Sequence, residues 1–258
     1  MMNQFDAVES MPVEERESWQ AVAVHQLAER LRPPSDFPCV FSQSAFSRGK
    51  ILFSFVPSLT TLGMRIATND LRDYVELSRR WDGSVANAEP LIMFFCPNTI
   101  AADTVEGYHQ IGWQILQDWH REDTQPWPAE VSRDPHSPYW AMCFGGMQLF
   151  VNMSSPKHHI RRSRNLGDAL AFVINPRERF DIVAGNDDHG RRVRAQIRDR
   201  IEKYDGIPHA PQLGSYQAGE LEWWQYGIPE NNRSRTDRCP FKQRTEDDSS
   251  RMLKDVRQ

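Results

Sequence analysis

The sequence lacks the segments that mark membrane-spanning and secreted proteins. Its longest apolar run, Leu91 to Cys96, has the length of one strand and is far shorter than the roughly 18 apolar residues that cross a bilayer. Residues Met1 to Arg16 are acidic and contain no apolar core of the kind that a signal peptide needs. We therefore expect a cytoplasmic protein with no membrane partner.

Cysteine is scarce and scattered along the chain. The four cysteines stand at positions 39, 96, 143 and 239, so there is no C-x-x-C pair for zinc and no C-x-x-C-H motif for covalent haem attachment. A thiolate can bind haem iron. A small buried apolar residue is the more common role of a reduced cysteine, and this is our interpretation of all four.

Nucleotide-binding loops are also missing, and the charge balance argues against a nucleic-acid partner. The sequence contains no G-x-G-x-x-G motif and no Walker loop. The formal net charge is −4, which is not built to attract nucleic acid. Lysine is rare, so most cationic sites are arginine forks, which pair well with carboxylates and phosphates. The arginine-rich stretch 191–200 is interpreted as the solvated face of a helix.

Aromatic residues are plentiful, and the apolar pattern predicts an α+β protein. The 8 Trp and 13 Phe supply large side chains for one core. We expect a single domain with a mixed, mostly antiparallel sheet flanked by helices. The predicted strands are 51–56, 91–96, 139–144, 147–153 and 169–175, and the predicted helices are 14–31, 71–81, 103–120 and 191–204.

Residues that are typical of helix starts and turns mark the boundaries between these predicted elements. Asp103 with Glu106 resembles a capping box, and Gly145-Gly146 is typical of a two-residue hairpin turn. Residues 37–49 are predicted to be loop or turn, and the aromatic segment 205–241 is expected to wrap the domain irregularly. The predicted organisation is a flexible N-terminus over 1–13, one catalytic domain over 14–241 and a disordered tail over 242–258.

The most informative stretch is Ser155 to Arg164, which follows the predicted strand 147–153. It places His158 and His159 at a strand end, followed within five residues by three arginines. Imidazole is a common ligand of iron and zinc, and arginine binds anionic groups. A metal ligand beside an anion clamp matches the needs of non-covalently bound haem, whereas a solvated basic turn is the simpler interpretation.

Two further histidines, His109 and His120, are predicted to lie on one face of the helix 103–120. Eleven residues of helix separate them by about 16 Å, which is too far for one metal ion. We interpret each as a helix histidine with its hydrogen bonds satisfied.

Several short segments in a fixed order resemble the YqcI/YcgG family, over residues 37 to 241. The matching pieces are Phe37-Pro38-Cys39 with Ala45 and Gly49, Trp127-Pro128, Asp134-Pro135 with Trp140, Cys143-Phe144-Gly145-Gly146, Pro156-Lys157-His158 with Arg161-Arg162-Ser163-Arg164, Tyr204-Asp205, Leu213-Gly214-Ser215-Tyr216, Trp224-Gln225-Tyr226 and Cys239-Pro240-Phe241.

The resemblance implies a haem-dependent oxygenase that N-hydroxylates a guanidine group, as family members do in D-cycloserine and guanitoxin biosynthesis. It implies haem b and O₂ as cofactors, an arginine-like substrate, and a separate protein that supplies electrons. A homodimer is a further expectation. The Pro-x-His of the family falls on His158, the predicted axial ligand. The next residue is usually arginine in the family and is His159 here, so this second imidazole is the other candidate ligand.

The remaining site residues follow from what a haem and a guanidine need. Arg161, Arg162 and Arg164 are candidates for pairing with the propionates, and Gly145-Gly146 is a candidate for close backbone approach to a flat cofactor. Glu106 and Asp118 are the predicted catalytic carboxylates, chosen from a pool that also contains Glu122, Asp123 and Asp134 near four tryptophans.

Two other functions stay open from the sequence. One is a haem-binding or gas-sensing protein without turnover, which shares the ligand and not the substrate pocket. The other is a non-haem iron or zinc enzyme that uses His158, His159 and a distant carboxylate.

Overall fold

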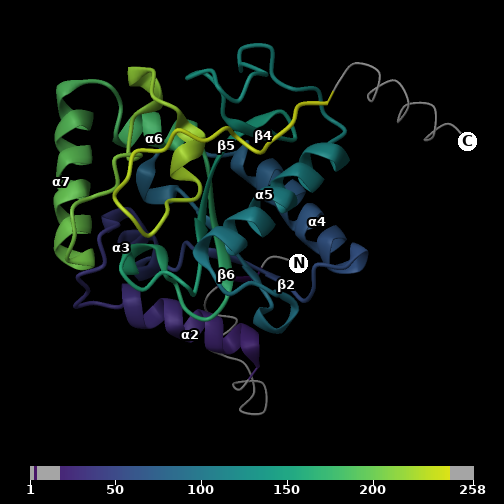
Figure 1. The fold of residues 1–258 in the computed structure, drawn as a ribbon, viewed down its shortest axis with the longest axis horizontal. Coiled ribbons are helices and arrows are strands. Elements are labelled where there is room, and N and C mark those ends of the chain that lie inside the picture. Colours follow the sequence, from purple (N-terminus) through teal and green to yellow (C-terminus); the bar gives the residue numbers. More distant parts are fainter. Residues whose placement is uncertain (1–2, 5–17, 245–258) are drawn as a thin grey trace, which may run out of the picture.

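A mixed sheet runs through the centre of the molecule, with helices on both of its faces (Figure 1). The computed structural model describes residues 3–4 and 18–244. The strands lie in the order β1-β2-β3-β6-β5-β4. Their bounds are β1 Asn3–Gln4, β2 Leu52–Val56, β3 Leu91–Phe95, β4 Met142–Phe144, β5 Met147–Ser154 and β6 Leu170–Pro176.

The predicted fold class is confirmed. Among the described strands, β2 and β3 run parallel, and the other four neighbouring pairs are antiparallel. The central strand β3, with the sequence LIMFF, is buried on both faces, as its continuous apolar run indicates. Alternate residues of the strands point to opposite faces, so the sheet carries one core on each side.

One face is covered by α4 (Thr61–Ser78) and α5 (Val105–Glu122). Leu71 and Tyr74 of α4 and Trp113 and Trp119 of α5 belong to the same core as the inward residues of the sheet on that side. The aromatic residues Trp223 and Tyr226 complete this core. The segment 205–241, which was predicted to wrap the domain, therefore packs against α5 through these aromatic residues.

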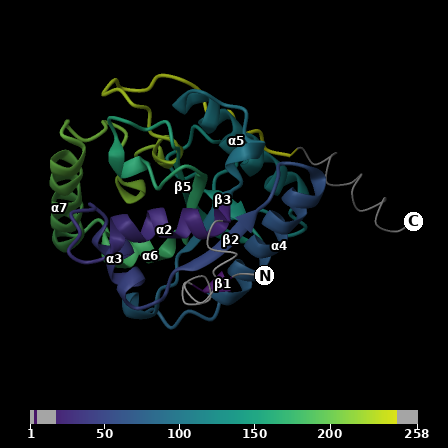
Figure 2. The same cartoon turned by 90° about the horizontal axis from the view of Figure 1, so that it is seen from below.

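The opposite face is covered by α2 (Trp19–Leu31) and α3 (Val40–Ser47), whose apolar side chains form the second core. The helices α6 (Glu178–Val183) and α7 (Asp188–Asp205) follow β6. Figures 1 and 2 place α7 beside α3 and α6, away from α4 and α5. The helices of this side frame the cavity described below.

The helix ends show which boundary signals were informative. Ser18 caps α2 by accepting a hydrogen bond from the amide of Ala21 at 3.3 Å. Gly206 ends α7 in the left-handed conformation, with φ 73°, which is typical of a glycine after a helix. The predicted capping box at Asp103 was wrong, because Thr104 is the cap of α5 and accepts from the amide of Gly107 at 3.1 Å.

Two predicted segments need correction, and one helix was not predicted. Residues 40–47 form helix α3 within the segment predicted as loop, and α6 was not predicted at all. Helix α4 begins at Thr61 and not at 71, so Asn69 lies inside the helix, where it accepts a hydrogen bond from Arg72. Each of these segments is rich in polar residues, which weakens the helical periodicity that prediction relies on.

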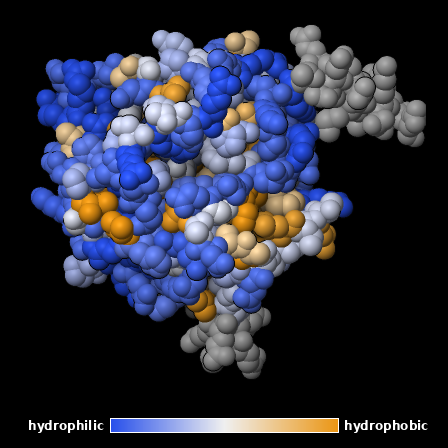
Figure 3. Space-filling model, in the orientation of Figure 1, coloured by the Kyte–Doolittle hydropathy of each residue, from blue (hydrophilic) through white to orange (hydrophobic). Residues whose placement is uncertain are grey.

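The predicted hairpin between β4 and β5 is confirmed, with Gly145 and Gly146 at φ 60° and 72°. The first predicted strand of this hairpin is shorter than expected and begins at Met142. The predictions of a flexible segment 1–13 and a disordered tail 242–258 fall largely outside the described residues. Within them, Asn3–Gln4 pair with β2, and the amide of Lys242 donates to Gln117 of α5. The face in Figure 3 is largely hydrophilic, with apolar residues gathered in small patches.

Candidate functional site

The stretch 155–164, which the sequence singled out, is an ordered loop and not a solvated turn. The amide of Ser155 donates to the carbonyl of Arg164 at 3.0 Å, which closes the loop at its base. The Asn165 side chain donates to the carbonyls of Pro156 and His158 at 3.2 and 3.0 Å. These hydrogen bonds fix the backbone that carries the predicted ligand.

His158 is 1% exposed and holds a defined tautomer. Its Nε2 lies 2.9 Å from the carbonyl of Ile228, and because a carbonyl only accepts, Nε2 carries the proton. The lone pair of Nδ1 is then free, and this atom has no partner among the described residues. Burial lowers the pKa of His158, so the ring is neutral at pH 7. This is the form that a metal ligand requires.

His109, from α5, lies against His158. The two ring centroids are 5.7 Å apart, and Nε2 of His109 also lacks a partner in the described part of the chain. Burial, reinforced by His158, lowers the pKa of His109 to about 3. The prediction of a satisfied helix histidine was therefore wrong for His109, and it is confirmed for His120, whose Nε2 accepts from the amide of Arg244.

The His109–His158 pair lacks further donors of the usual kind. No group of three or more His, Cys, Asp or Glu side chains is placed to hold a metal ion among residues 3–4 and 18–244. His159, the second predicted ligand, is exposed to solvent and lies outside this pair.

Arg161 is buried and committed to the backbone of the wrapping segment. It is 1% exposed, and its Nε donates to the carbonyl of Pro229 at 2.8 Å. Its Nη2 donates to the carbonyl of Asn231 at 3.2 Å and to the side chain of Asn232. Arg161 therefore ties the loop to residues 229–232.

Arg162 and Arg164 differ sharply in their surroundings. Arg162 is exposed, donates to the carbonyl of Tyr204 and lies 4.7 Å from the centre of that ring. Arg164 is 8% exposed, and its Nη1 has no hydrogen-bond partner among the described residues. Of the three arginines predicted to pair with an anion, Arg164 is the one with a buried nitrogen still to be satisfied.

A cavity of about 590 Å³ lies between the sheet and the helices of the α2, α3 side. This volume is within the roughly 300–1,000 Å³ range of cofactor and ligand sites. Its lining is mainly apolar and includes Leu27, Leu31, Phe37, Phe41, Ala45, Ile92, Phe150, Val173, Phe180, Ile197 and Ile201. Arg164, Arg48 and Arg179 also reach it, whereas His158 and His109 are not among its lining residues.

Polar atoms enter this cavity from the sheet and from α3. Asn152 of β5 lines it, and Oδ1 of that side chain is buried without a partner among the described residues. Cys39 also lines it, so the interpretation as a small buried apolar residue holds for Cys96, Cys143 and Cys239 and not for Cys39, which is half-buried. The sequence signal for Asn152 is a polar residue at an inward position of a strand.

A family model described as the YqcI/YcgG family matches residues 27–242 of the sequence. The chain belongs to this family. The order of short motifs noted in the sequence thus predicted the family correctly.

Relatives support the assignment over most of the chain. A protein of Streptomyces lavendulae with the name "Putative N(omega)-hydroxy-L-arginine synthase DcsA" is 53% identical over 223 residues, which are 86% of this chain and 84% of the relative. The uncharacterized proteins YcgG and YqcI of Bacillus subtilis (strain 168) are 31% and 30% identical, covering 88% and 86% of this chain and 90% and 87% of their own lengths. No solved structure matches this family member. None of the helices in its described part combines the length and apolarity of a membrane span.

The other predicted site residues, Gly145, Gly146, Glu106 and Asp118, are not among those that line the cavity. Gly145 and Gly146 precede β5 and His158 follows it, so they lie beyond opposite ends of a strand whose 8 residues span roughly 23 Å. Glu106 is exposed near the start of α5. Asp118 accepts hydrogen bonds from Gln114 and Arg121 on the same helix. Asp118 and the two glycines are not brought together with His158 or Arg164, whereas Glu106 lies on α5 one turn before His109, the neighbour of His158.

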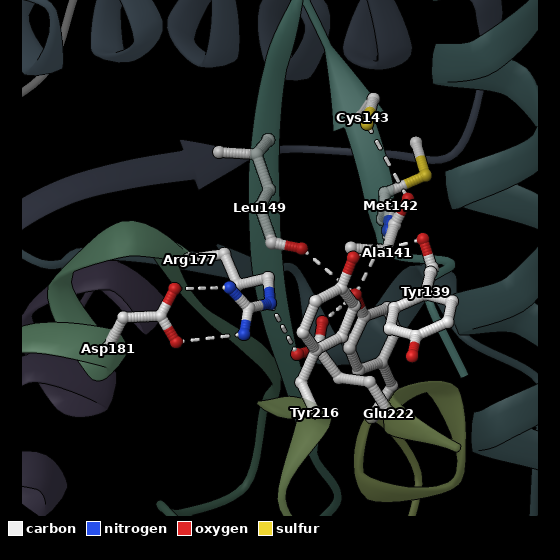
Figure 4. A network of polar contacts seen from close by, with 10 residues as sticks. Tyr139, Ala141, Met142, Cys143, Leu149, Arg177, Asp181, Tyr216 and Glu222 are labelled. Carbon is white, nitrogen blue, oxygen red and sulfur yellow. Dashed lines mark hydrogen bonds and ion pairs between the residues drawn. The ribbon is translucent and has the colours of Figure 1, made fainter. Parts of the chain in front are cut away.

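A polar network that the sequence did not reveal adjoins the cavity. Arg177 donates to both oxygens of Asp181 at 2.6 and 2.9 Å and to Glu222 at 3.0 Å, with its guanidinium 3.5 Å from the centre of the Tyr216 ring (Figure 4). These residues line a smaller cavity of about 170 Å³, which shares Phe150 and other lining residues with the larger one. Two carboxylates and an aromatic face here hold a guanidinium that belongs to the protein itself.

Proposed function

We propose that this protein is a haem-dependent oxygenase that N-hydroxylates a guanidine group, with L-arginine as the substrate and Nω-hydroxy-L-arginine as the product. The relative from Streptomyces lavendulae carries the name of an Nω-hydroxy-L-arginine synthase and is 53% identical over 86% of this chain. That level of identity over nearly the whole domain favours a shared reaction.

The observation that carries the haem proposal is the apolar cavity of about 590 Å³ with a buried, unsatisfied arginine at its wall. A haem needs an apolar slot for its ring and cations for its two propionates. The aliphatic and aromatic lining provides the first, and Arg164 and Arg48 provide the second. The residues present therefore fit the cofactor.

Haem, when bound, supplies the activation of O₂ with electrons from an external reductase. The protein has other tasks in this scheme. The apolar walls exclude water, and the Oδ1 of Asn152 is a free acceptor for a guanidine N–H within the cavity. Phe150 lies at the junction of the two cavities and offers an aromatic face to a cationic substrate.

The family pattern predicts His158 as the iron ligand, and Glu106 and Asp118 are the predicted catalytic carboxylates. A separate electron-transfer protein, a homodimer and a cytoplasmic location are likewise part of this proposal. Of the three arginines predicted to pair with the propionates, Arg164 is the best supported, because it lines the cavity and its Nη1 has no partner among the described residues.

A non-haem metal enzyme is the second candidate function. The neighbouring rings of His109 and His158, each with one buried nitrogen that has no partner among the described residues, favour it. It differs from the sequence-based version in replacing the exposed His159 by His109.

The decisive experiment is a spectrum of the purified protein after hemin titration, with metal and porphyrin quantified in parallel. We expect a Soret band, and we expect it to shift when arginine is added, as the spin state of the iron changes. Incubation with arginine, reductant and O₂ should give a product that is one oxygen atom heavier than arginine. Iron without porphyrin would support the second candidate. Haem uptake with no oxygenated product from any guanidine compound would instead favour a haem-binding sensor.

A further inference from the structure

Cys39 occupies a position unlike that of the other cysteines. It immediately precedes α3, and its Sγ accepts a hydrogen bond from the amide of Ser42 at 3.4 Å. The side chain is half-buried and lines the cavity of about 590 Å³. A sulfur at a helix N-terminus that also faces an open volume has a backbone N–H donor to orient it and room for a ligand.

Arg164 gives independent evidence that this cavity receives an anionic ligand. Its side chain is 8% exposed, lines the same cavity as Cys39, and leaves Nη1 without a partner among the described residues. Burial lowers the pKa of Arg164 to about 10, and the nearby Asp205 and Cys39 oppose this effect. A buried guanidinium with an unsatisfied nitrogen is costly unless a bound group completes it.

His158 lies in a different environment. Its imidazole hydrogen-bonds to Ile228, and its ring contacts His109, which belongs to the helix on the other face of the sheet. It does not line the cavity. The described contacts of His158 hold the loop 155–164 against the wrapping segment, as those of Arg161 do.

We propose that Cys39, in place of the His158 that the family pattern predicts, supplies the iron ligand of haem bound in this cavity, with Arg164 pairing with a propionate. The inference rests on the proposed function, because it assigns a ligand to the cofactor proposed there. The amide of Ser42 then serves as the second partner that orients the sulfur and tunes the iron, as hydrogen bonds to a ligating thiolate do. The role of His158 becomes the positioning of the loop that presents Arg164.

The test compares the ferrous–CO spectra and the ferric electron paramagnetic resonance spectra of three haem-loaded variants with those of the wild-type protein. Cys39→Ser keeps a good helix cap while removing the thiolate. His158→Gln keeps a donor for the carbonyl of Ile228. Cys143→Ala removes a buried cysteine that does not line the cavity and is the matched control.

We expect the wild-type protein to show the strongly red-shifted Soret band of a thiolate–CO complex. Cys39→Ser should lose this signature, Cys39→His should replace it with that of an imidazole ligand, and His158→Gln and Cys143→Ala should retain it. Circular dichroism establishes that each variant is folded before its spectrum is compared.

An imidazole-type spectrum in the wild-type protein, lost in His158→Gln and kept in Cys39→Ser, overturns the assignment of Cys39 while leaving the haem proposal intact. A folded wild-type protein that takes up no haem overturns the proposed function itself. The two failures are therefore distinguishable from the same set of spectra.

Discussion

Glu222 is a carboxylate that is only 4% exposed and shares hydrogen bonds with two partners. It accepts from Arg177, and it lies 3.0 Å from the hydroxyl of Tyr226. That hydroxyl also lies 2.9 Å from the carbonyl of Leu149, and it has one proton to donate. A proton on Glu222 relieves this competition, because the Tyr226 hydroxyl, which donates to the Glu222 carboxylate, can then donate to the carbonyl of Leu149 alone.

The pH dependence of stability should report this proton. Burial raises the pKa of Glu222 from 4.5 to about 7, with Arg177 opposing the change. The folded state then binds the proton more tightly than the unfolded state, so the contribution of this group is complete below pH 4.5 and is lost as the pH rises through 7. We expect the stability of the wild-type protein, relative to Glu222→Gln, to fall by about 3 kcal/mol across this window.

Urea unfolding of both proteins at a series of pH values measures this difference. Glu178→Gln, which removes an exposed carboxylate of α6, serves as the control and should follow the wild-type curve. A constant difference between wild type and Glu222→Gln over the whole range would show that Glu222 titrates normally.

The sequence was enough to single out His158, and it was not enough to find His109 beside it or the cavity beside Cys39. His158 could be singled out because two histidines and three arginines follow a strand. Nothing local marks His109 as its neighbour, because the two lie 49 positions apart and meet only when α5 packs against the loop. Cys39 was recognised as part of a family motif, but its exposure to a cavity depends on the unpredicted helix α3.

At the scale of elements, the hairpin between β4 and β5 depends on two glycines with positive φ. At Gly145, an added Cβ would lie 3.1 Å from Cγ1 of Val75 in α4, so this turn also packs closely against a helix. Gly206, at the end of α7, has a similar φ of 73° and open space where a Cβ would lie. At both positions an L-residue would be strained by the positive φ, but only at Gly145 would its Cβ also press against another side chain.

Alanine at each position separates these effects. Gly206→Ala should cost about 1 kcal/mol, because only the left-handed backbone conformation is strained. Gly145→Ala should cost about 1 kcal/mol more, because Val75 must also move. Urea unfolding midpoints of the two variants provide the comparison, and equal losses would mean that the contact with Val75 relaxes freely.

The elements that were predicted well share a simple physical signature. Strands β3, β5 and β6 have strong apolar patterns, and α7 is bounded by a polar cap and by Gly206. Helices α3 and α6 are short, and α4 begins with polar turns, so their formation depends on tertiary packing that no local pattern reports.

For the molecule as a whole, the sheet separates two environments. One face, under α4 and α5, is a dense aromatic core that ends at the His109–His158 pair. The other face, under α2 and α3, holds the cavity with Cys39, Arg164 and Asn152. His158 and Arg164 are only six positions apart in the sequence, yet they have different neighbours. The hydrogen-bonded loop 155–164 turns the imidazole of His158 towards Ile228 and His109, while Arg164 lines the cavity.

The proposed location of haem makes a prediction about volume. Ala45 of α3 is buried and lines the cavity, so Ala45→Phe would place a phenyl ring in the space that the macrocycle needs. Because the ring enters an apolar void, we expect folding stability to change by less than about 1.5 kcal/mol. Haem uptake should fall by at least tenfold in a hemin titration followed at the Soret band. Ala101→Phe, at an exposed position before α5, should bind as the wild-type protein does. Wild-type haem affinity in a folded Ala45→Phe variant would place the cofactor elsewhere and would return attention to the space around His109 and His158.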